Sequence, residues 1–237
     1  MDKELAELVE RLHAAFGDGL QSVILYGSAA GGDYIPGRSN LNVLCVLREV
    51  GVAELEKSRP VAEWWRKLRQ PSPLLLAREE LDRARDAFPI EFLDLIERHR
   101  VLYGDDVIKN LVIEPLHHRA QLEHELRAKL LRLRGRYAAV ATDAEAVIRL
   151  MVEVVPNFAA LFRHVLLVSG ASAPFGKADV FRAAGERFGF DPQAFLETLE
   201  VRRGARKAKS LDARATFTGY LAGVARMTAA VDGLLVQ

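Results

Sequence analysis

Residues 22–47 read SVILYGSAAGGDYIPGRSNLNVLCVL. The run of residues 22–26 is short and apolar and is followed at once by glycine, which predicts a strand. A second run, residues 40–47, is largely apolar on both of its faces, which is typical of a strand covered on both sides. Glycines and a Pro-Gly pair lie between the two runs, so we expect a loop with tight turns to connect the strands.

Polar groups in and beside this loop point to an anionic ligand. Gly27 allows a ligand to approach the backbone closely. Ser28 and the amides after it are expected to open a short helix, where free N–H groups favour phosphate. Asn40 and Asn42 are two residues apart on a strand, so their side chains face the same side. Two neighbouring carboxamides need hydrogen-bond partners, because their burial otherwise costs free energy.

Together these features resemble the signature of the nucleotidyltransferase superfamily with the DNA polymerase β-like fold. The resemblance rests on Gly27-Ser28, the glycine-containing loop, the turn of residues 36–39 and the Asn-Leu-Asn of residues 40–42. The nearest branch comprises the minimal and the aminoglycoside nucleotidyltransferases. The resemblance implies an α+β chain, in which residues 1–113 form a small mixed sheet with helices and residues 114–237 form an all-α helical bundle. A cleft between these two domains is the expected ligand site.

In that family the Gly-Ser pair holds a nucleoside triphosphate. Two aspartates, with a third carboxylate on a later strand, bind two Mg²⁺ ions, and a nucleotide monophosphate is transferred to a hydroxyl group. The resemblance therefore assigns nucleotide binding to Gly27, Ser28 and Ser39, and it assigns the metal positions to Asn40 and Asn42.

The sequence departs from the family pattern at both metal positions, because asparagine stands where the aspartates are expected. A carboxamide offers a neutral oxygen, whereas Mg²⁺ prefers anionic oxygens. Each charge lost at about 4 Å removes roughly 4 kcal/mol of attraction at an effective dielectric constant of about 20. Two-metal catalysis depends on two bound Mg²⁺ ions that stabilise the attacking and leaving oxygens, so the usual transfer reaction is expected to be weakened or lost. The presence of asparagine at both metal positions is compatible with natural degeneration and with an engineered substitution.

The sequence also departs from the family pattern at Gly31, a loop position where relatives often carry a basic residue.

Two acidic residues are candidates for the family's third acidic position. Glu91 is the first choice and Asp94 the second. Residues 90–95 fit either a strand or a helix, and on a strand these two side chains would face opposite sides, so only one would enter the site. One carboxylate with two carboxamides would then hold a single Mg²⁺ through the phosphates of the nucleotide.

Three cations are candidates for binding phosphate. Arg38 precedes the second strand, and Arg127 and Lys129 lie near the middle of a helix expected at residues 115–141. The alternative for the helix is a solvated face on which Glu and Arg or Lys pair four residues apart. For Arg38 the alternative is a residue that only flanks the turn.

Periodicity and turn residues predict the remaining elements. Helices are expected at residues 3–16, 52–69, 78–86, 115–141, 142–170, 178–188, 191–203 and 210–235, and short strands at residues 74–76 and 101–103. Thr142 with Glu145 is expected to form a capping box, and Pro156 to kink or split the helix that follows.

Composition narrows the class of protein. The 237 residues carry 33 basic and 32 acidic side chains and are 50% hydrophobic. This excludes a disordered polyelectrolyte, and the near-zero net charge argues against a dedicated nucleic-acid binder. The apolar runs are shorter than the roughly 18–20 residues that cross a bilayer, so no membrane span is expected. The N-terminus does not resemble a signal peptide, and the single cysteine, Cys45, fits a reducing cytoplasm.

Charge is divided unevenly along the chain. Residues 1–113 carry 15 basic and 19 acidic side chains, and residues 114–237 carry 18 and 13. One explanation of this division is chance together with solvated faces. The alternative is an acidic and a basic domain that meet around an anionic ligand.

Three functions remain open at this stage. The first is an enzyme that transfers a nucleotide to a hydroxyl group of a small molecule or a macromolecule. The second is a nucleotide-binding or regulatory module that has lost catalysis. The third is an interaction protein whose bundle forms a homodimer or binds a protein partner. No residue identifies the acceptor or the nucleotide base.

Overall fold

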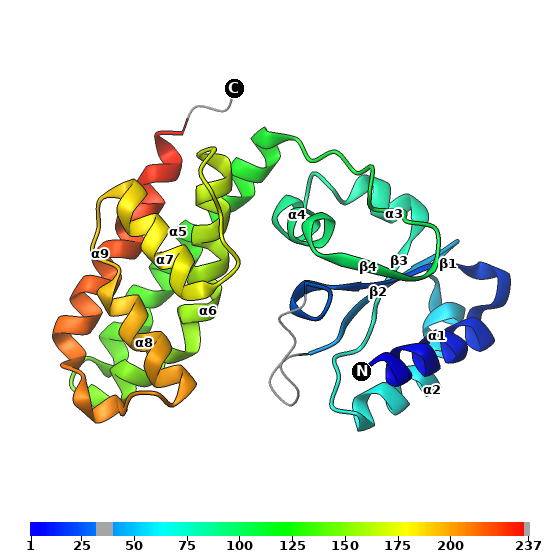
Figure 1. The fold of residues 1–237 in the computed structure, drawn as a ribbon, viewed down its shortest axis with the longest axis horizontal. Coiled ribbons are helices and arrows are strands. Elements are labelled where there is room, and N and C mark those ends of the chain that lie inside the picture. The colour runs from blue at the N-terminus through cyan, green and yellow to red at the C-terminus, as the bar shows by residue number, and fades with distance from the viewer. Residues whose placement is uncertain (32–39, 235–237) are drawn as a thin grey trace. The chain divides into compact units, whose positions relative to one another are not determined.

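The computed structural model describes residues 1–31 and 40–234, which form two compact units (Figure 1). Unit 1 comprises residues 1–114 and unit 2 begins at residue 115, one residue after the predicted boundary. Unit 1 combines a sheet with helices, and the described part of unit 2 is helical. The predicted fold class, an α+β domain followed by an all-α bundle, is therefore confirmed.

Unit 1 is built on a small mixed sheet with the strand order β3-β2-β1-β4. The central strand β1 (Leu20–Tyr26) pairs antiparallel with β2 (Asn42–Leu47) and with β4 (His99–Gly104). The short edge strand β3 (Leu74–Ala77) lies parallel to β2. Because β1 and β2 are antiparallel neighbours, the end of β1 and the start of β2 lie side by side.

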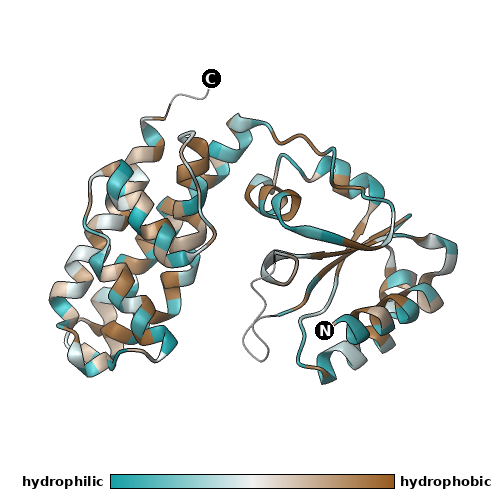
Figure 2. Cartoon of the chain, viewed as in Figure 1, coloured by the Kyte–Doolittle hydropathy of each residue, from teal (hydrophilic) through white to brown (hydrophobic). Residues whose placement is uncertain are grey.

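Helices cover both faces of this sheet (Figures 1 and 2). The helices α1 (Asp2–Phe16) and α2 (Val52–Lys67) cover one face, and α3 (Arg78–Arg83) and α4 (Pro89–Glu97) cover the other. Alternate residues of β1 belong to the two cores: Val23 and Leu25 pack toward α1 and α2, and Ile24 packs toward α3 and α4. In β2, Cys45 belongs to the first core and Leu44 to the second, so the prediction that the strand in residues 40–47 is covered on both sides is confirmed.

Residues 90–95 belong to helix α4 and not to a strand. Pro89 occupies the first turn, where its missing N–H is tolerated. Pro89, Phe92 and Leu95 are buried at intervals of three residues, which is a helical and not a strand spacing. The helical alternative for this segment is therefore the correct one.

The helices of unit 2 are α5 (Pro115–Val140), α6 (Ala144–Val168), α7 (Lys177–Phe188), α8 (Gln193–Arg203) and α9 (Ala213–Asp232). Short 3-10 turns cover Gly17–Gly19 and Gly27–Ala29 in unit 1 and Ala208–Ser210 in unit 2. The predicted capping box at Thr142 is wrong. Asp143 caps α6 instead, because its Oδ1 accepts the N–H of Ala146 at 2.9 Å. Pro156 lies inside α6, which continues past it.

Helix α6 is long and apolar enough to cross a membrane by length and composition, which the sequence prediction did not anticipate. Its most apolar 18-residue window is 56% buried inside the protein. Phe158 and Phe162 of this helix lie in the aromatic core of the bundle. This burial is typical of the core helix of a soluble protein.

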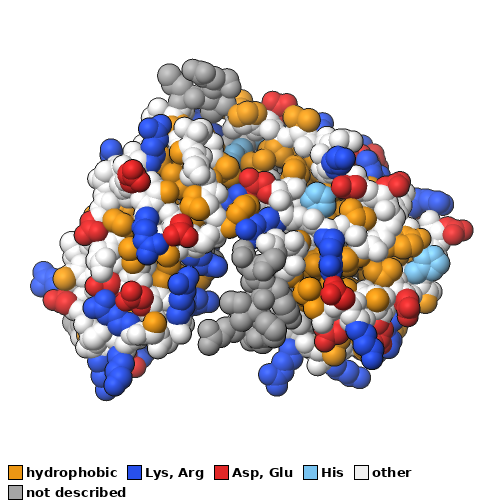
Figure 3. Space-filling view, viewed as in Figure 1, with side chains coloured by type: hydrophobic (Ala, Val, Ile, Leu, Met, Phe, Trp, Pro, Cys, Tyr) orange, Lys and Arg blue, Asp and Glu red, His pale blue; other side chains and the backbone are white. Residues whose placement is uncertain are grey.

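Charged side chains of both signs are interspersed on the face drawn in Figure 3. This view agrees with the near-zero net charge of the sequence.

Candidate functional site

The predicted Gly-Ser turn follows directly on β1. Gly27 has a φ of +77°, a conformation that glycine adopts at little cost. Its carbonyl oxygen accepts the N–H groups of Ala30 and Gly31, both at 3.1 Å, and its own N–H donates to the carbonyl oxygen of Arg98 at 3.1 Å. Residues 27–31, called the 27–31 turn below, are thus held by hydrogen bonds within the turn and by one to the end of α4.

Asn42 lies directly beside this turn. The sheet register pairs Asn42 with Tyr26, the residue before Gly27. A methyl group on Gly27 would lie 3.4 Å from Nδ2 of Asn42. The structure therefore brings together the turn that carries Ser28 and one of the two predicted carboxamides.

The strand predicted at residues 40–47 is shorter in the structure, because β2 begins at Asn42 and Asn40 lies two residues before it. Asn40 is exposed and Asn42 is partly buried, whereas Leu41 is fully buried. The N–H of Leu41 donates to Oε1 of Gln70 at 2.8 Å, and this contact fixes the start of β2. Arg38 and Ser39, the other predicted binding residues near this strand, lie outside the described residues.

Arg98 contacts the same turn with its side chain. A methyl group on Gly31 would lie 2.7 Å from Cδ, Nε and Cζ of Arg98. The guanidinium group is therefore packed against Gly31, while the carbonyl group of the same residue accepts the N–H of Gly27. Sequence reasoning missed this residue, because Arg98 is separated from the turn by more than half of unit 1 and lies in no motif.

No protein-family model matches the sequence, and no curated protein matches it. Among solved structures, the chain is similar to the spectinomycin adenyltransferase AAD(9) from Enterococcus faecialis, whose crystal structure contains ATP and spectinomycin. The match has a TM-score of 0.56 and covers 95% of this chain and 98% of the other, with 14% sequence identity. The chain therefore shares its overall fold with this adenyltransferase. At this identity the similarity concerns the fold, which confirms the resemblance in architecture.

Acidic side chains are absent from the described strands of this sheet. The strands β1 to β4 read LQSVILY, NVLCVL, LLLA and HRVLYG, so within the described part of the sheet no strand carries Asp or Glu. Within residues 1–31 and 40–234, no group of three or more His, Cys, Asp and Glu side chains is suited to hold a metal ion. The donors present do not fit a two-Mg²⁺ clamp, because carboxamides supply no negative charge.

The acidic candidates Glu91 and Asp94 both lie on α4. They are three residues apart on a helix and therefore share a face, so the expectation that they point to opposite sides, which assumed a strand, does not hold. The resemblance implies a third carboxylate on a later strand, and neither Glu91 nor Asp94 lies on a strand.

On β4, a histidine stands opposite the end of β1. The register pairs His99 with Tyr26, on the side away from Asn42. Its Nδ1 lies 3.0 Å from the carbonyl oxygen of Ile96 and its Nε2 lies 3.2 Å from Oδ2 of Asp106. Burial alone would raise the pKa of Asp106, but the hydrogen bond and charge of His99, with two backbone N–H groups, lower it overall. His99 thus orders the segment after β4.

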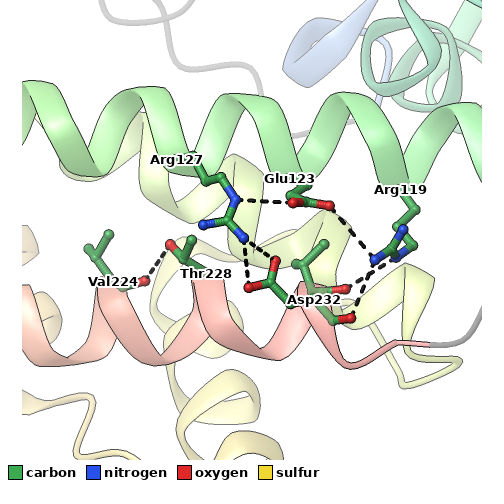
Figure 4. Close-up of polar contacts among 7 residues, drawn as sticks. Arg119, Glu123, Arg127, Val224, Thr228 and Asp232 are labelled. Atoms are coloured by element: carbon green, nitrogen blue, oxygen red, sulfur yellow. Dashed lines mark hydrogen bonds and ion pairs between the residues drawn. The ribbon is translucent and has the colours of Figure 1, made fainter.

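The two helix cations proposed for phosphate form ion pairs within unit 2, and Figure 4 shows those of Arg127. Nη2 of Arg127 lies 2.7 and 2.8 Å from the two carboxylate oxygens of Asp232, and its Nε lies 3.0 Å from Glu123. Nζ of Lys129 lies 2.8 Å from Glu125, four residues earlier. These contacts agree with the alternative of a face with ion pairs. Phosphate binding by either residue stays a prediction.

Proposed function

We propose that this protein binds a nucleoside triphosphate at the 27–31 turn and does not catalyse metal-dependent nucleotidyl transfer. The observation that carries the proposal is the position of the Asn42 carboxamide beside Gly27, on a sheet whose described strands carry no acid. The protein then acts as a nucleotide-binding module on an enzyme fold.

The chemistry of asparagine favours this function over a weakened enzyme. A carboxylate beside a triphosphate repels it unless a metal ion lies between them, whereas a carboxamide has an NH₂ group that donates to phosphate. Replacement of two carboxylates by carboxamides therefore removes both the metal site and the repulsion. A site of this kind prefers the nucleotide without Mg²⁺.

Calorimetry with the full chain tests the proposal. ATP is titrated once with EDTA and once with excess Mg²⁺, and pyrophosphate release is followed in parallel. We expect binding in EDTA that Mg²⁺ does not strengthen, and no pyrophosphate. The absence of binding heat in both buffers would disprove the proposal, and release of pyrophosphate with Mg²⁺ would establish the enzyme instead.

Restoring the acids provides the second arm of this test. In the variant Asn40→Asp with Asn42→Asp, ATP binding in EDTA is expected to weaken by at least about tenfold and to recover with Mg²⁺, because two charges at about 4 Å act on the phosphates. The control changes the other two asparagines, Asn110 and Asn157, to Asp. Both are exposed and add the same charge, and the control is expected to bind like the unchanged protein.

A reducing compartment such as the cytoplasm suits this function. Cys45 is fully buried, and burial raises the pKa of its thiol to about 12, so it behaves as an apolar core residue.

A further inference from the structure

We propose that Arg98 is the cation that binds the triphosphate at the 27–31 turn and that it supplies the positive charge without a metal ion. This inference rests on the proposed function and deepens it, because it names the recognised group as a metal-free polyphosphate. Two contacts of Arg98 with the turn carry the inference.

Arg98 is held to the turn at both ends of the residue. Its carbonyl oxygen accepts the N–H of Gly27 at 3.1 Å, and its side chain packs against Gly31. The absence of a side chain at Gly31 is what leaves room for the guanidinium group, because even a methyl group would come within 2.7 Å of it. The cation therefore lies on the loop that carries Ser28.

A polyphosphate at this turn needs positive charge from a side chain. The donors beside the turn do not fit a metal clamp, since Asn40 and Asn42 are neutral. The turn itself, Gly27–Ala29, is a single 3-10 turn, which is too short to provide the dipole of an α-helix. A guanidinium group meets the need, because its five N–H donors bind two phosphate oxygens at once and leave donors for other contacts.

The other predicted cations are placed differently. Arg127 and Lys129 lie on α5 of unit 2 and not on the elements that contact the turn, and Arg38 lies outside the described residues. Arg100, two residues after Arg98, pairs with Asp2 of α1 at 2.9 Å. Arg100 has the same charge and lies close to Arg98 in the sequence, but its side chain contacts α1 and not the turn, so it is a matched control.

The test compares Arg98→Gln with Arg100→Gln by calorimetry with ATP in EDTA. A hydrogen bond to a charged group is worth about 1.5–3 kcal/mol, so we expect Arg98→Gln to weaken ATP binding about ten- to a hundredfold. Arg100→Gln is expected to bind within about twofold of the unchanged protein, because its side chain pairs away from the turn. Thermal unfolding of both variants checks that each is folded.

A second variant moves the guanidinium group and keeps its charge. Gly31→Ala places a methyl group where the Arg98 side chain now lies, at a residue without a left-handed φ, so the backbone is not strained. We expect a several-fold loss of ATP affinity with little change in stability. This variant decides the question if Arg98→Gln does not fold.

The outcomes separate the inference from the proposed function. ATP binding by the unchanged protein, together with unaltered binding by Arg98→Gln and Gly31→Ala, would overturn the role of Arg98 and leave the proposed function intact. Failure of the unchanged protein to bind ATP would overturn both.

Discussion

At the end of β4, Gly104 combines a left-handed φ of +72° with very close packing. A methyl group at this position would overlap the carbonyl oxygen of Gln21 on β1. Because the register pairs Gly104 with Ser22, this contact lies inside the β1–β4 ladder. The backbone itself, and not a movable side chain, would have to shift to accept any other residue.

The variant Gly104→Ala should therefore lower the stability of unit 1 strongly. The left-handed backbone costs about 1–2 kcal/mol for alanine, and the overlap adds about 1–3 kcal/mol. Urea unfolding followed by tryptophan fluorescence measures the loss, since both tryptophans, Trp64 and Trp65, lie in α2 of unit 1.

Gly189→Ala in unit 2 separates the two contributions to this loss. Gly189 also has a left-handed φ, of +70°, but a methyl group there meets no atom within 4 Å. Its loss of stability, followed by far-ultraviolet circular dichroism, should show the backbone cost alone. Equal losses for both variants would mean that the β1–β4 ladder yields to the overlap at no cost.

At the residue scale, sequence predicted the parts of the site that lie within one motif. Gly27, Asn40 and Asn42 are separated by a single loop, so strand geometry was enough to place the carboxamide near the turn. Arg98 and His99 reach the end of β1 only because β4 pairs with β1. That pairing spans about seventy residues, and no local pattern encodes it.

At the scale of single elements, helix α9 depends on a cap at its first turn. Oδ1 of Asp212 accepts the N–H groups of Arg214 and Ala215, each at 3.0 Å. These N–H groups have no partner within the helix, so the cap satisfies them. The helix then presents Phe217 and Tyr220 to the core of unit 2.

Asp212→Ala should destabilise unit 2 by about 1 kcal/mol, since alanine leaves both N–H groups without the side-chain acceptor. Asp212→Asn keeps an oxygen at the same position and should lose much less. Far-ultraviolet circular dichroism during urea unfolding compares the two variants. An equal loss in both would show that the charge of Asp212, and not its hydrogen bonds, stabilises α9.

Helices were predicted correctly where the apolar residues followed the helical period alone. The type of element stayed open where the apolar residues fitted both the helical and the strand period. The helices with long apolar stripes, such as α5, begin and end within a few residues of the prediction. In α4, the six apolar residues of nine fit both periods, and burial at intervals of three residues decided for a helix. At α6, two adjacent residues, Thr142 and Asp143, are both good caps, and spacing alone selected the wrong one.

At the scale of the whole molecule, the change from mixed to helical patterning marked the division into two units. The boundary at residue 114 coincides with the start of the purely helical sequence at Pro115. The sequence could not reveal the detailed packing of each core, because packing depends on which faces meet in space. The aromatic cluster of unit 2 is an example, since its members Phe162, Phe181, Phe195 and Tyr220 come from four helices.

Because each unit has its own core, a cavity in one core should leave the other stable. Phe195 is fully buried, and its ring centroid lies 4.5 Å from that of Phe181 and 4.3 Å from that of Tyr220. Phe195→Ala should lower the stability of unit 2 by about 3–5 kcal/mol. Circular dichroism, dominated by the helices of unit 2, should therefore show unfolding at a lower urea concentration. Tryptophan fluorescence, which reports on unit 1, should keep its midpoint. A common shift of both signals would mean that the two units unfold as one.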